Sequence, residues 1–385
     1  MRILIVGLST RAIAESAVRG GYNVVTLDYF GDRDQRALVR NYALQRDFDL
    51  PFSPGALIEA SDGLAFDAVA YTSSLENHPE VVEKLAQGRE LLGNPLGVLR
   101  AVRDWARLRA VCDEEGIPYA TTLLPGEETK ADPTGRWLRK PVRSGGGHGI
   151  EPWSGGSLGE GYVLQEQVEG QPASAAFVAD GKRSVLLGVS EQLIGREALG
   201  AHGYTWCGNI LPLALRSGAG IEAIVQSLER TAARLTQRFN LRGVNGMDFV
   251  VADDAEGQVH PSLVEINPRY SASMELMDRA YGLSAFDLHV RSFDGELPAY
   301  SLAERLDDPR FCGKGIVYAD ENVVMPNTAD WRREGRRDIP FSGERIEAGH
   351  PICTVVAEGE SRAGCWQTLV RKAEDVRNTL IGDNL

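Results

Sequence analysis

The chain has 385 residues, of which 43% are hydrophobic and 25% are charged, and these proportions are those of an ordinary soluble globular protein. A chain of this length exceeds a single compact core, so we expect about two to four subdomains. The 41 basic and 54 acidic residues give a net charge of −13. This charge disfavours nonspecific binding to nucleic acids, so we expect no nucleic-acid partner.

Targeting and disulfide signals do not stand out in the sequence. Its apolar runs stay below about twenty residues, the length that a membrane-spanning helix needs, so we expect no membrane partner. The N-terminus, MRILIVGLST, enters an apolar strand directly rather than a secretory leader. The five cysteines form no close metal-ligand pairs, and their odd number argues against a complete disulfide framework. A reducing cytoplasm is therefore the expected location.

Residues 1–100 alternate strand and helix signals, which predicts an α/β domain with a parallel sheet. A buried strand at RILIVG is followed by an amphipathic helix, TRAIAESAVRGG, and by a second strand, YNVVTLDYF. The first turn, GLSTR, lacks the three-glycine pattern of dinucleotide-binding folds, which argues against NAD. Arg11 in this turn either binds an anionic substrate or is a surface residue.

Polar residues follow a later strand of the same domain. The segment FDAVAYTSSLENHPEVVEKLAQ reads as a strand, a loop and a helix. Its loop carries Ser74, Glu76 and Asn77 beyond the carboxyl end of the strand, where open α/β sheets bind ligands. An alternative role for Asn77 is to cap the helix, which Pro79 would begin. We expect these three residues, with Arg11, to lie on the substrate side of a site.

A glycine loop follows a short strand that carries a lysine. After Arg100 the pattern predicts one helix to Glu115, ended by Gly116. The segment WLRKPVRSGGGHGI then places Lys140 shortly before the loop. Such a loop lets backbone N–H groups approach phosphate oxygens, and the lysine adds positive charge. Taken alone, the glycines are most often an ordinary loop and the lysine an edge-strand residue.

Two downstream strands carry candidate metal ligands. A helix predicted over residues 221–238 leads to GVNGMDFVV, which contains Asp248, and LVEINPR places Glu265, Asn267 and Arg269 on alternate residues. Side chains on a strand alternate between its faces, so these last three share one face. Carboxylate and amide oxygens suit Mg²⁺, and a guanidinium suits phosphate. Alternatively, the EIN tripeptide is only a strand end and Asp248 a turn acceptor.

In their order and spacing these motifs resemble the ATP-grasp superfamily, and more closely its carboxylate–amine ligase branch. The resemblance covers roughly the first three hundred residues. It implies a Rossmann-like domain over residues 1–100, followed by a two-lobed ATP-grasp domain of α+β lobes over residues 101–300. Within the latter, the glycine-loop lobe would span about 115–165 and the metal-binding lobe about 166–300.

The resemblance also implies roles for single residues. Lys140 would contact the α- and β-phosphates and Arg269 would steady the transferred phosphate, which makes these two the catalytic candidates. Asp248, Glu265 and Asn267 would bind Mg²⁺, with Mn²⁺ as an alternative. The other ATP contacts would come from the loop over the triphosphate and from the strand that holds adenine, YVLQEQVEG: Ser144, Gly145, Gly146, Gly147, His148, Gly149, Gln165, Glu166, Gln167 and Val168. His148 is equally consistent with an exposed loop histidine.

The chain departs from the family pattern within the nucleotide site. Many relatives carry a second phosphate-binding lysine before the helix that opens the ATP-grasp region, where this chain has Trp105. Arg103 or Arg107 can substitute for the charge, but Trp105 cannot. A ribose-binding carboxylate of relatives has no counterpart in GQPAS, and Asp248 is one methylene shorter than the usual glutamate.

Residues 301–385 change character. Just upstream, ASMELMDRAYGLSAFDLHVRSF reads as a helix with Met274, Met277 and Phe286 on its buried stripe. Short strands in KGIVYADENVVMPNT and GERIEAGHPICTVVAEGE, and the helix GCWQTLVRKAEDVRNTL, then predict a small β-rich module with a terminal helix. GERIEAGHPICTV is similar to a carrier-protein hairpin, but it has no lysine at a methionine-flanked tip. We therefore expect a structural cap, with a homodimer contact as the alternative.

The resemblance implies an ATP-dependent ligase that joins a small-molecule carboxylate to an amine through an acyl phosphate and releases ADP and phosphate. The motifs GLSTR, SLEN, SGGGHGI and EINPRYSASMEL are also similar to those of ATP-grasp proteins in one-carbon pterin and furan cofactor synthesis, which favours glutamate or a similar amine. The alternatives are an ATP-grasp carboxylase, a phosphoribosyl-type ligase, or a noncatalytic Mg-ATP sensor.

Overall fold

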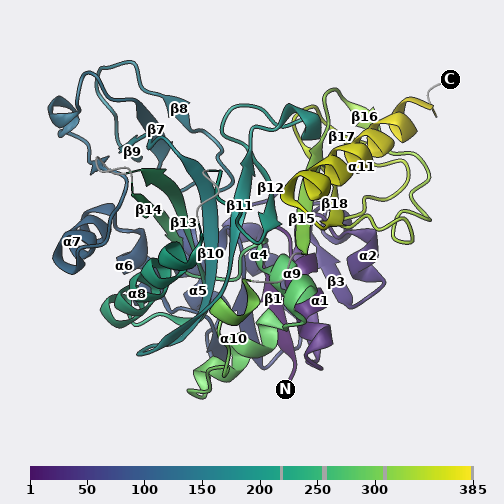
Figure 1. Ribbon diagram of the computed structural model, residues 1–385. Helices are drawn as coiled ribbons and strands as arrows, with labels where there is room; N and C mark the ends of the chain where they lie inside the picture. Colours follow the sequence, from purple (N-terminus) through teal and green to yellow (C-terminus); the bar gives the residue numbers. More distant parts are fainter. Residues whose placement is uncertain (217–219, 254–257, 307–309, 383–385) are drawn as a thin grey trace.

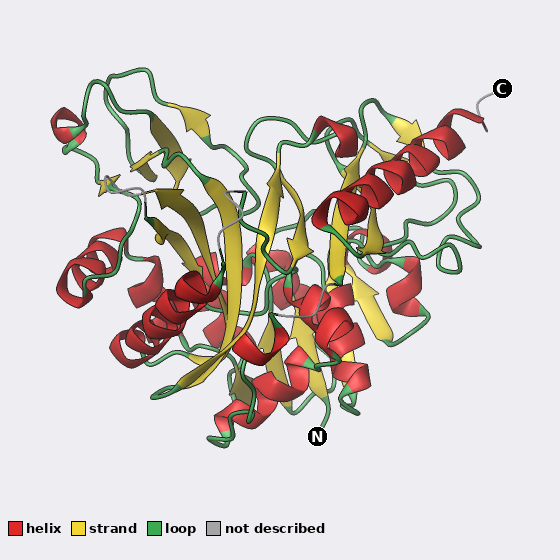
Figure 2. Cartoon of the chain, viewed as in Figure 1, coloured by secondary structure: helices red, strands yellow, loops and turns green. Residues whose placement is uncertain are grey.

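A computed structural model describes residues 1–216, 220–253, 258–306 and 310–382. A parallel sheet near the N-terminus and a larger antiparallel sheet dominate the molecule, and a small sheet lies beyond one end of the larger one (Figure 1). Helices cover the sheets on several sides (Figure 2). Every helix in the described ranges is either too short or too polar to cross a bilayer.

The N-terminal part forms a five-stranded parallel sheet in the order β3-β2-β1-β4-β5, which confirms the predicted parallel sheet. Its central strands are runs of apolar residues because helices cover both faces. The strands are β1 (Ile3–Val6), β2 (Val24–Asp28), β3 (Arg40–Ala43), β4 (Ala68–Tyr71) and β5 (Glu90–Leu92). The helices are α1 (Arg11–Arg19), α2 (Arg33–Arg36), α3 (Leu44–Asp47), α4 (Pro54–Ser61), the 3₁₀ turn η1 (Leu75–Asn77) and α5 (Pro79–Leu85).

Two helices, rather than the one predicted, connect this sheet to the next lobe: α6 (Leu96–Arg103) and α7 (Trp105–Glu115). The break lies at Asp104, whose carboxylate accepts hydrogen bonds from the backbone N–H groups of Ala106 and Arg107 and so begins a new helix. Gly116 then ends α7 with a φ of 60°, a left-handed conformation that favours glycine.

The lobe that follows is a four-stranded sheet in the order β6-β9-β7-β8. The predicted lysine strand and its glycine loop are found there as a hairpin between β7 and β8. The elements are β6 (Thr122–Leu123), η2 (Glu128–Lys130), β7 (Trp137–Pro141), β8 (Glu151–Pro152) and β9 (Tyr162–Glu166).

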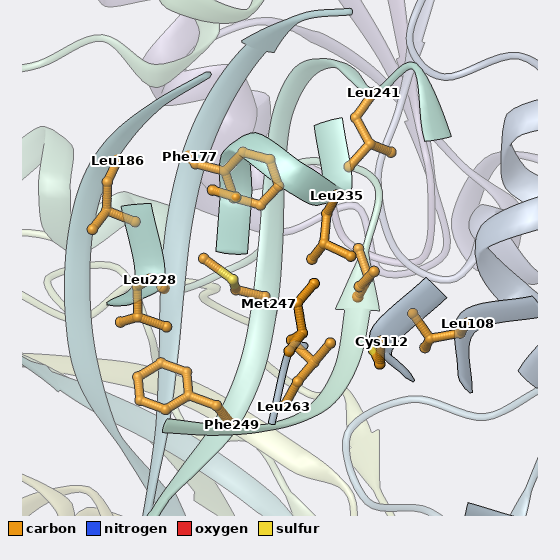
Figure 3. Close-up of a cluster of buried hydrophobic side chains, with 14 of the residues drawn as sticks. Leu108, Cys112, Phe177, Leu186, Leu228, Leu235, Leu241, Met247, Phe249 and Leu263 are labelled. Carbon is orange, nitrogen blue, oxygen red and sulfur yellow. The ribbon is translucent and has the colours of Figure 1, made fainter. Parts of the chain in front are cut away.

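The largest sheet is antiparallel, in the order β14-β13-β10-β11-β12-β15-β18. Helix α8 (Glu222–Phe239), predicted from its periodicity, covers one face, where its leucines pack against residues such as Phe177 and Met247 (Figure 3). The first strands are β10 (Gln171–Asp180), β11 (Ser184–Ile194), β12 (Trp206–Leu211), β13 (Arg242–Asp253) and β14 (Val259–Asn267), with η3 (Glu197–Leu199) between β11 and β12. The opposite face packs against other helices through residues such as Ala176, Val178 and Val244, and it carries polar side chains such as Ser174 and Asp248 further along.

Two more helices, α9 (Met274–Tyr281) and α10 (Ala285–Phe293), lie between the two large sheets. The sequence predicted one continuous helix here, which is wrong because Gly282 adopts a φ of 67° and Ser284 caps a new helix at the N–H of Asp287. The predicted burial of Met274, Met277 and Phe286 is confirmed.

The C-terminal segment extends the large sheet. Strands β15 (Phe311–Tyr318) and β18 (Pro351–Gly359) continue it beyond β12, and helix α11 (Arg362–Gly382) packs on them. The turn η4 (Ala303–Arg305) precedes β15, and β16 (Val323–Val324) pairs with β17 (Arg345–Ile346) in the intervening loop. The domain bounds near residues 100 and 300 stay predictions, but these strands do not form a detached sheet.

Candidate active site

The candidate metal ligands lie on adjacent strands, β13 and β14. Met247 and Phe249 point into the core beneath α8, so Asp248 between them points to the opposite face. The antiparallel register then places Glu265 directly opposite Asp248. A register shift follows at once, since Phe249 pairs with Leu263. This bulge lies next to the paired carboxylates, where such irregularities commonly redirect side chains.

The two carboxylates differ in their environment. Asp248 accepts hydrogen bonds from Gln192 Nε2 and Asn267 Nδ2, both at 3.0 Å. Burial and the neighbouring charge of Glu265 raise the pKa of Asp248 to about 8. Against the effect of its own burial, the charges of Lys140 and Arg103 lower the pKa of Glu265 below its usual value. The pair therefore favours one ionised carboxylate when no cation is bound.

The donor set suits a hard divalent cation. Asp248, Glu265 and Asn267 bring two carboxylates and an amide oxygen to one face of the sheet. In the parts of the chain that the structure describes, no three His, Cys, Asp or Glu side chains form a ready-made metal cluster. Mg²⁺ is commonly bound by one or two carboxylates together with substrate phosphates, so these residues fit the ion as nucleotide-dependent ligands.

Lys140 on β7 is held by a chain of hydrogen bonds that reaches β14. The lysine is only 7% exposed, and its Nζ donates to Gln165 Oε1 at 2.7 Å. Gln165 Nε2 in turn lies 3.1 Å from both Thr122 Oγ1 and the carbonyl oxygen of Val264 in the bulge. Burial lowers the pKa of Lys140, while Glu265 acts in the opposite direction. The sequence predicted Gln165 on the strand that would hold adenine, but it did not predict this contact of the Gln165 side chain.

Of the two arginines expected to replace the missing family lysine, Arg103 lies at the site. Its Nη1 is 3.9 Å from Glu265 Oε2, and its Nη2 donates to the carbonyl oxygen of Val142 at 3.1 Å. Arg107, on the next helix α7, instead lies over the ring of Phe239. Trp105 supplies no charge, but its ring centroid is 5.6 Å from Lys140 Nζ, which is a cation–π arrangement.

The glycine loop rests on the connection between β11 and β12. The N–H of Trp206 donates to the carbonyl oxygen of Gly146 at 3.0 Å. Gly147 has a φ of 83°, and a Cβ there would lie 1.9 Å from the carbonyl oxygen of Tyr204, so only glycine fits this approach. Ser144 Oγ donates to the carbonyl oxygen of His148, whose ring is exposed. Gly145 and Gly149 complete the loop, and no sequence signal pointed to its support.

The segment expected to hold adenine follows β9. The N–H of Glu166 donates to the carbonyl oxygen of Thr121, and that of Gln167 to the carbonyl oxygen of Arg136, both at 2.8 Å. Among the described residues, no acceptor faces the N–H of Val168. Of these three consecutive backbone donors, only the one at Val168 is available to a ligand.

Arg269 lies just beyond β14 and contacts the N-terminal domain. Its Nη2 donates to Glu76 Oε1 at 2.6 Å and to Asn267 Oδ1 at 3.2 Å. Asn77 does not cap α5, whose N-cap is His78 without a side-chain bond, so that alternative is wrong. Instead, Asn77 Nδ2 donates to the carbonyl oxygen of a loop residue, Ser144, at 3.3 Å. Glu76 and Asn77 therefore touch both halves of the candidate site.

The neighbouring Ser74 is partly exposed, and its carbonyl oxygen accepts the N–H of Asn77. The structure thus places Glu76 against Arg269 and Asn77 against the glycine loop, and their binding of a substrate stays a prediction.

Arg11 was predicted either to bind an anionic substrate or to lie on the surface, but the structure buries it among carboxylates. Its side chain is 1% exposed, so the surface alternative is wrong. Its donors are engaged by Glu275 at 2.7 and 2.9 Å, by Asp338 at 2.9 and 3.0 Å, and by Glu15 at 3.3 Å. In this arrangement Arg11 offers no donor to a substrate.

Residues 115–273 match the family model described as the ATP-grasp domain. Among curated proteins, an uncharacterized protein of Methanocaldococcus jannaschii is 20% identical over 379 residues, which cover 93% of this chain and 88% of that protein.

Several solved structures are similar in fold at low sequence identity. Pyruvate carboxylase of Rhizobium etli is 16% identical with a TM-score of 0.72; the match covers 96% of this chain but only 37% of that enzyme. An L-amino acid ligase of Bacillus licheniformis is 14% identical with a TM-score of 0.65 and 97% coverage of each chain. An N5-carboxyaminoimidazole ribonucleotide synthetase is 15% identical with a TM-score of 0.67, covering 98% of this chain and 97% of that one.

Proposed function

The chain contains an ATP-grasp domain, and from that premise we propose that it is an ATP-dependent ligase that joins a carboxylate to an amine through an acyl phosphate. The observation that carries the proposal is the convergence of Lys140, Arg269 and the Asp248–Glu265 pair between the glycine-loop lobe and the large sheet. These groups suit charge neutralisation during phosphoryl transfer rather than nucleophilic attack by a side chain.

The proposed reaction has two steps. A carboxylate acylates poorly because its leaving group would be oxide, so one of its oxygens first takes the γ-phosphoryl group as the bond to ADP breaks. The amine nitrogen then attacks the carbonyl carbon, the C–N bond forms, the bond to phosphate breaks and the nitrogen loses a proton. Lys140, held by Gln165, and Arg269, held by Glu76, are positioned to bind phosphate oxygens during these steps.

The carboxylates have a complementary task. Asp248 and Glu265, with Asn267, would hold Mg²⁺, which neutralises phosphate charge when bound. The loop over residues 144–149 would exclude water, because acyl phosphates hydrolyse. The free N–H of Val168 would meet adenine, next to the backbone of Glu166 and Gln167.

The proposal extends to the substrates and the setting. We infer small-molecule substrates, with glutamate or a similar amine in cofactor biosynthesis as the acceptor. The five cysteines are free and buried, which suits a reducing cytoplasm. The C-terminal segment would act as a cap of the large sheet, with a homodimer contact as its alternative role.

A carboxylase is the second candidate, because pyruvate carboxylase and biotin carboxylase domains are similar to this chain in fold. A carboxylase would release ADP in a reaction that depends on bicarbonate and needs no amine.

The test is ADP release by the purified chain with Mg-ATP and paired panels of carboxylates and amines, with AMP followed in parallel. We expect ADP without AMP, dependent on one pair. Lys140→Ala and Glu265→Ala should each lower the rate about a hundredfold or more while the circular dichroism spectrum is unchanged. Lys84→Ala, at an exposed position of α5, is the control and should keep the wild-type rate.

Near-normal turnover in both site variants would show that the site is misassigned. AMP as the product would contradict the acyl-phosphate route. Bicarbonate-dependent ADP release without an amine would favour the carboxylase.

A further inference from the structure

Two consecutive side chains of the N-terminal domain are buried between the halves of the candidate site. Glu76 is 2% exposed and Asn77 is 5% exposed. Each uses only one of its polar atoms, since Glu76 Oε1 accepts from Arg269 and Asn77 Nδ2 donates to Ser144. The other two, Glu76 Oε2 and Asn77 Oδ1, have no hydrogen-bond partner among the described residues.

The orientation of the Asn77 amide follows from its neighbour. The carbonyl oxygen of Ser144 can only accept, so the amide nitrogen must face it. The amide oxygen of Asn77 is therefore directed elsewhere, like the second carboxylate oxygen of Glu76. The two unpartnered acceptors belong to adjacent residues of the turn η1.

Buried acceptors without donors cost free energy, and in a native protein such atoms call for a ligand, a water or a catalytic role. A donor has to approach Glu76 and Asn77 for the site to be satisfied. Beside them, Arg269 Nε is a buried donor that also has no partner among the described residues. The site thus combines two free acceptors with one free cationic donor.

This combination matches the two partners of the proposed ligation. Arg269 Nε suits the anionic oxygens of the carboxylate or its phosphate. An amine at neutral pH is an ammonium group, which has only donors and needs acceptors around it. The negative charge of Glu76 and the amide oxygen of the adjacent Asn77 meet that need, and Glu76 lies directly beside the arginine.

We propose that Glu76 and Asn77 bind the protonated amino group of the amine substrate next to Arg269. The inference rests on the proposed ligase function and gives that function an acceptor site. It also requires an ammonium group with at least two N–H donors, one for each acceptor. Tertiary amines, which have one N–H when protonated, and N-acylated amino acids, whose nitrogen is uncharged, would therefore be poor ligands.

Binding tests the inference without turnover. The full chain, saturated with Mg-ADP, is titrated calorimetrically with L-glutamate, L-alanine and methylamine, and with N-acetyl-L-glutamate and N-acetyl-L-alanine as ligands that lack the ammonium group. We expect at least one of the three amines to bind and its N-acetyl counterpart, where there is one, to bind much more weakly. Glu76→Gln should raise the Kd about ten- to a hundredfold, as expected for a lost bond to a charged group.

The matched control is Glu80→Gln, which removes a carboxylate from the same segment at an exposed position. It should leave the Kd unchanged. Asn77→Leu is the second variant, which keeps the inference testable if Glu76→Gln does not fold. Equal affinity in wild type and both site variants, or no binding of any of the three amines to the wild type, would overturn the inference.

Turnover separates amine binding from a purely positioning role of Glu76. Hydroxylamine is largely uncharged near neutral pH, so hydroxamate formation reports activation of the carboxylate without an ammonium ligand. In Glu76→Gln we expect the loss of kcat/KM for the amine to exceed the loss of hydroxamate formation by about tenfold or more, because the glutamine amide oxygen can still accept from Arg269. An equal loss in both reactions would mean that Glu76 only positions Arg269, which overturns the inference.

The two proposals fail differently. If the wild type forms neither hydroxamate nor ADP but binds an amine in a Glu76-dependent manner, the ligase function is wrong and the ammonium site stands. If the wild type is an active ligase whose amine binding ignores Glu76 and Asn77, only the ammonium site is wrong.

Discussion

Single side chains decide how the candidate site is charged beside Glu265. Arg103, at the end of α6, lies 3.9 Å from Glu265, whereas Arg107, on α7, lies over the ring of Phe239. Arg103 Nε is buried and has no partner among the described residues, so it can turn to a phosphate oxygen. This arginine is thus placed to supply positive charge at the candidate site.

Arg103→Gln should therefore raise KM for ATP about tenfold, the usual effect of one lost charged hydrogen bond. Arg107→Gln has the same chemistry at a position away from the site and should keep KM within about twofold. Initial rates of ADP release at varied ATP measure both. Equal effects of the two substitutions would mean that Arg103 does not contact the nucleotide.

A buried histidine links α10 to both large sheets. His289 Nδ1 accepts the N–H of Val244, and its Nε2 therefore carries a proton, which it donates to the carbonyl oxygen of Leu92. Burial lowers the pKa of His289 from its ordinary 6.5 to about 4. Protonation would also remove the acceptor that Val244 uses.

The unfolded chain binds this proton below about pH 6.5 and the folded chain only below about pH 4. The stability due to His289 is therefore complete above pH 6.5 and falls as the pH drops to 4, by about 3 kcal/mol at most. Urea unfolding at a series of pH values should show this loss. His289→Gln, which keeps a donor and an acceptor, should flatten the slope, whereas His202→Gln in an exposed loop should retain it.

The sequence predicted which candidate-site residues share a strand. It did not predict which distant residues form hydrogen bonds with them. Glu265 and Asn267 follow from strand periodicity, and their position beside Asp248 follows from the family order of the motifs. The contact of Arg269 with Glu76 joins residues 193 positions apart, and no local pattern encodes it. The same is true of the Gln165 side chain, which contacts Val264 across 99 positions.

At the scale of elements, helix caps and close backbone approaches determine where segments begin, end and meet. Helix periodicity continues through Asp104 and through Gly282, so it predicted one helix where each pair of helices occurs. Asp104 competes as a cap for free N–H groups, and Gly282 adopts a left-handed conformation. Such cap geometry is fixed by the tertiary fold and is weakly marked in the sequence.

Gly208 lies where β12 pairs with β15. It has a φ of 145°, and a Cβ there would lie 2.0 Å from the carbonyl oxygen of Lys314. Gly208→Ala should therefore lower the free energy of unfolding by more than about 1 kcal/mol. Gly97→Ala is the control, since its Cβ would meet no atom within 4 Å in helix α6, and it should be neutral or slightly stabilising. The denaturant midpoints of the two variants and the wild type measure this difference. Equal midpoints for Gly208→Ala and Gly97→Ala would contradict the prediction.

Over the whole molecule, one buried ion network joins the N-terminal domain to the rest of the chain. Arg11 on α1 pairs with Glu275 on α9 and with Asp338, and Lys314 on β15 shares Glu275 at 2.8 Å. Arg279 also pairs with Glu275, at 2.9 Å. The network connects parts of the chain that the sequence assigned to separate domains.

Arg11→Met should destabilise the protein by about 3–5 kcal/mol, because buried carboxylates lose their partner. Arg19→Met removes a half-exposed arginine from the same helix, 3.3 Å from Asp278, and should cost no more than about 1 kcal/mol. Chemical unfolding of the two variants beside wild type measures the difference. A small effect of Arg11→Met would mean that the network contributes little net stability.

The sequence predicted the parallel sheet and the β-rich C-terminal segment from their own local patterns, and its resemblance to the ATP-grasp superfamily implied the two lobes between them. It did not predict that β15 and β18 join the large sheet. Strand pairing between Leu211 and Cys312 leaves no mark in either segment, since any apolar strand edge can accept a neighbour.

The order of synthesis gives the shared sheet a consequence for the nascent chain. The strands with the candidate-site residues leave the ribosome before Phe311, the first residue of β15. Until β15 arrives, the outer edge of β12 has unpaired backbone groups that can pair with another chain. Arg11 likewise cannot form its ion pair with Asp338 until that residue has been synthesised. A nascent chain that has emerged through Arg269 but not yet through Phe311 would therefore present the proposed catalytic residues on an aggregation-prone intermediate.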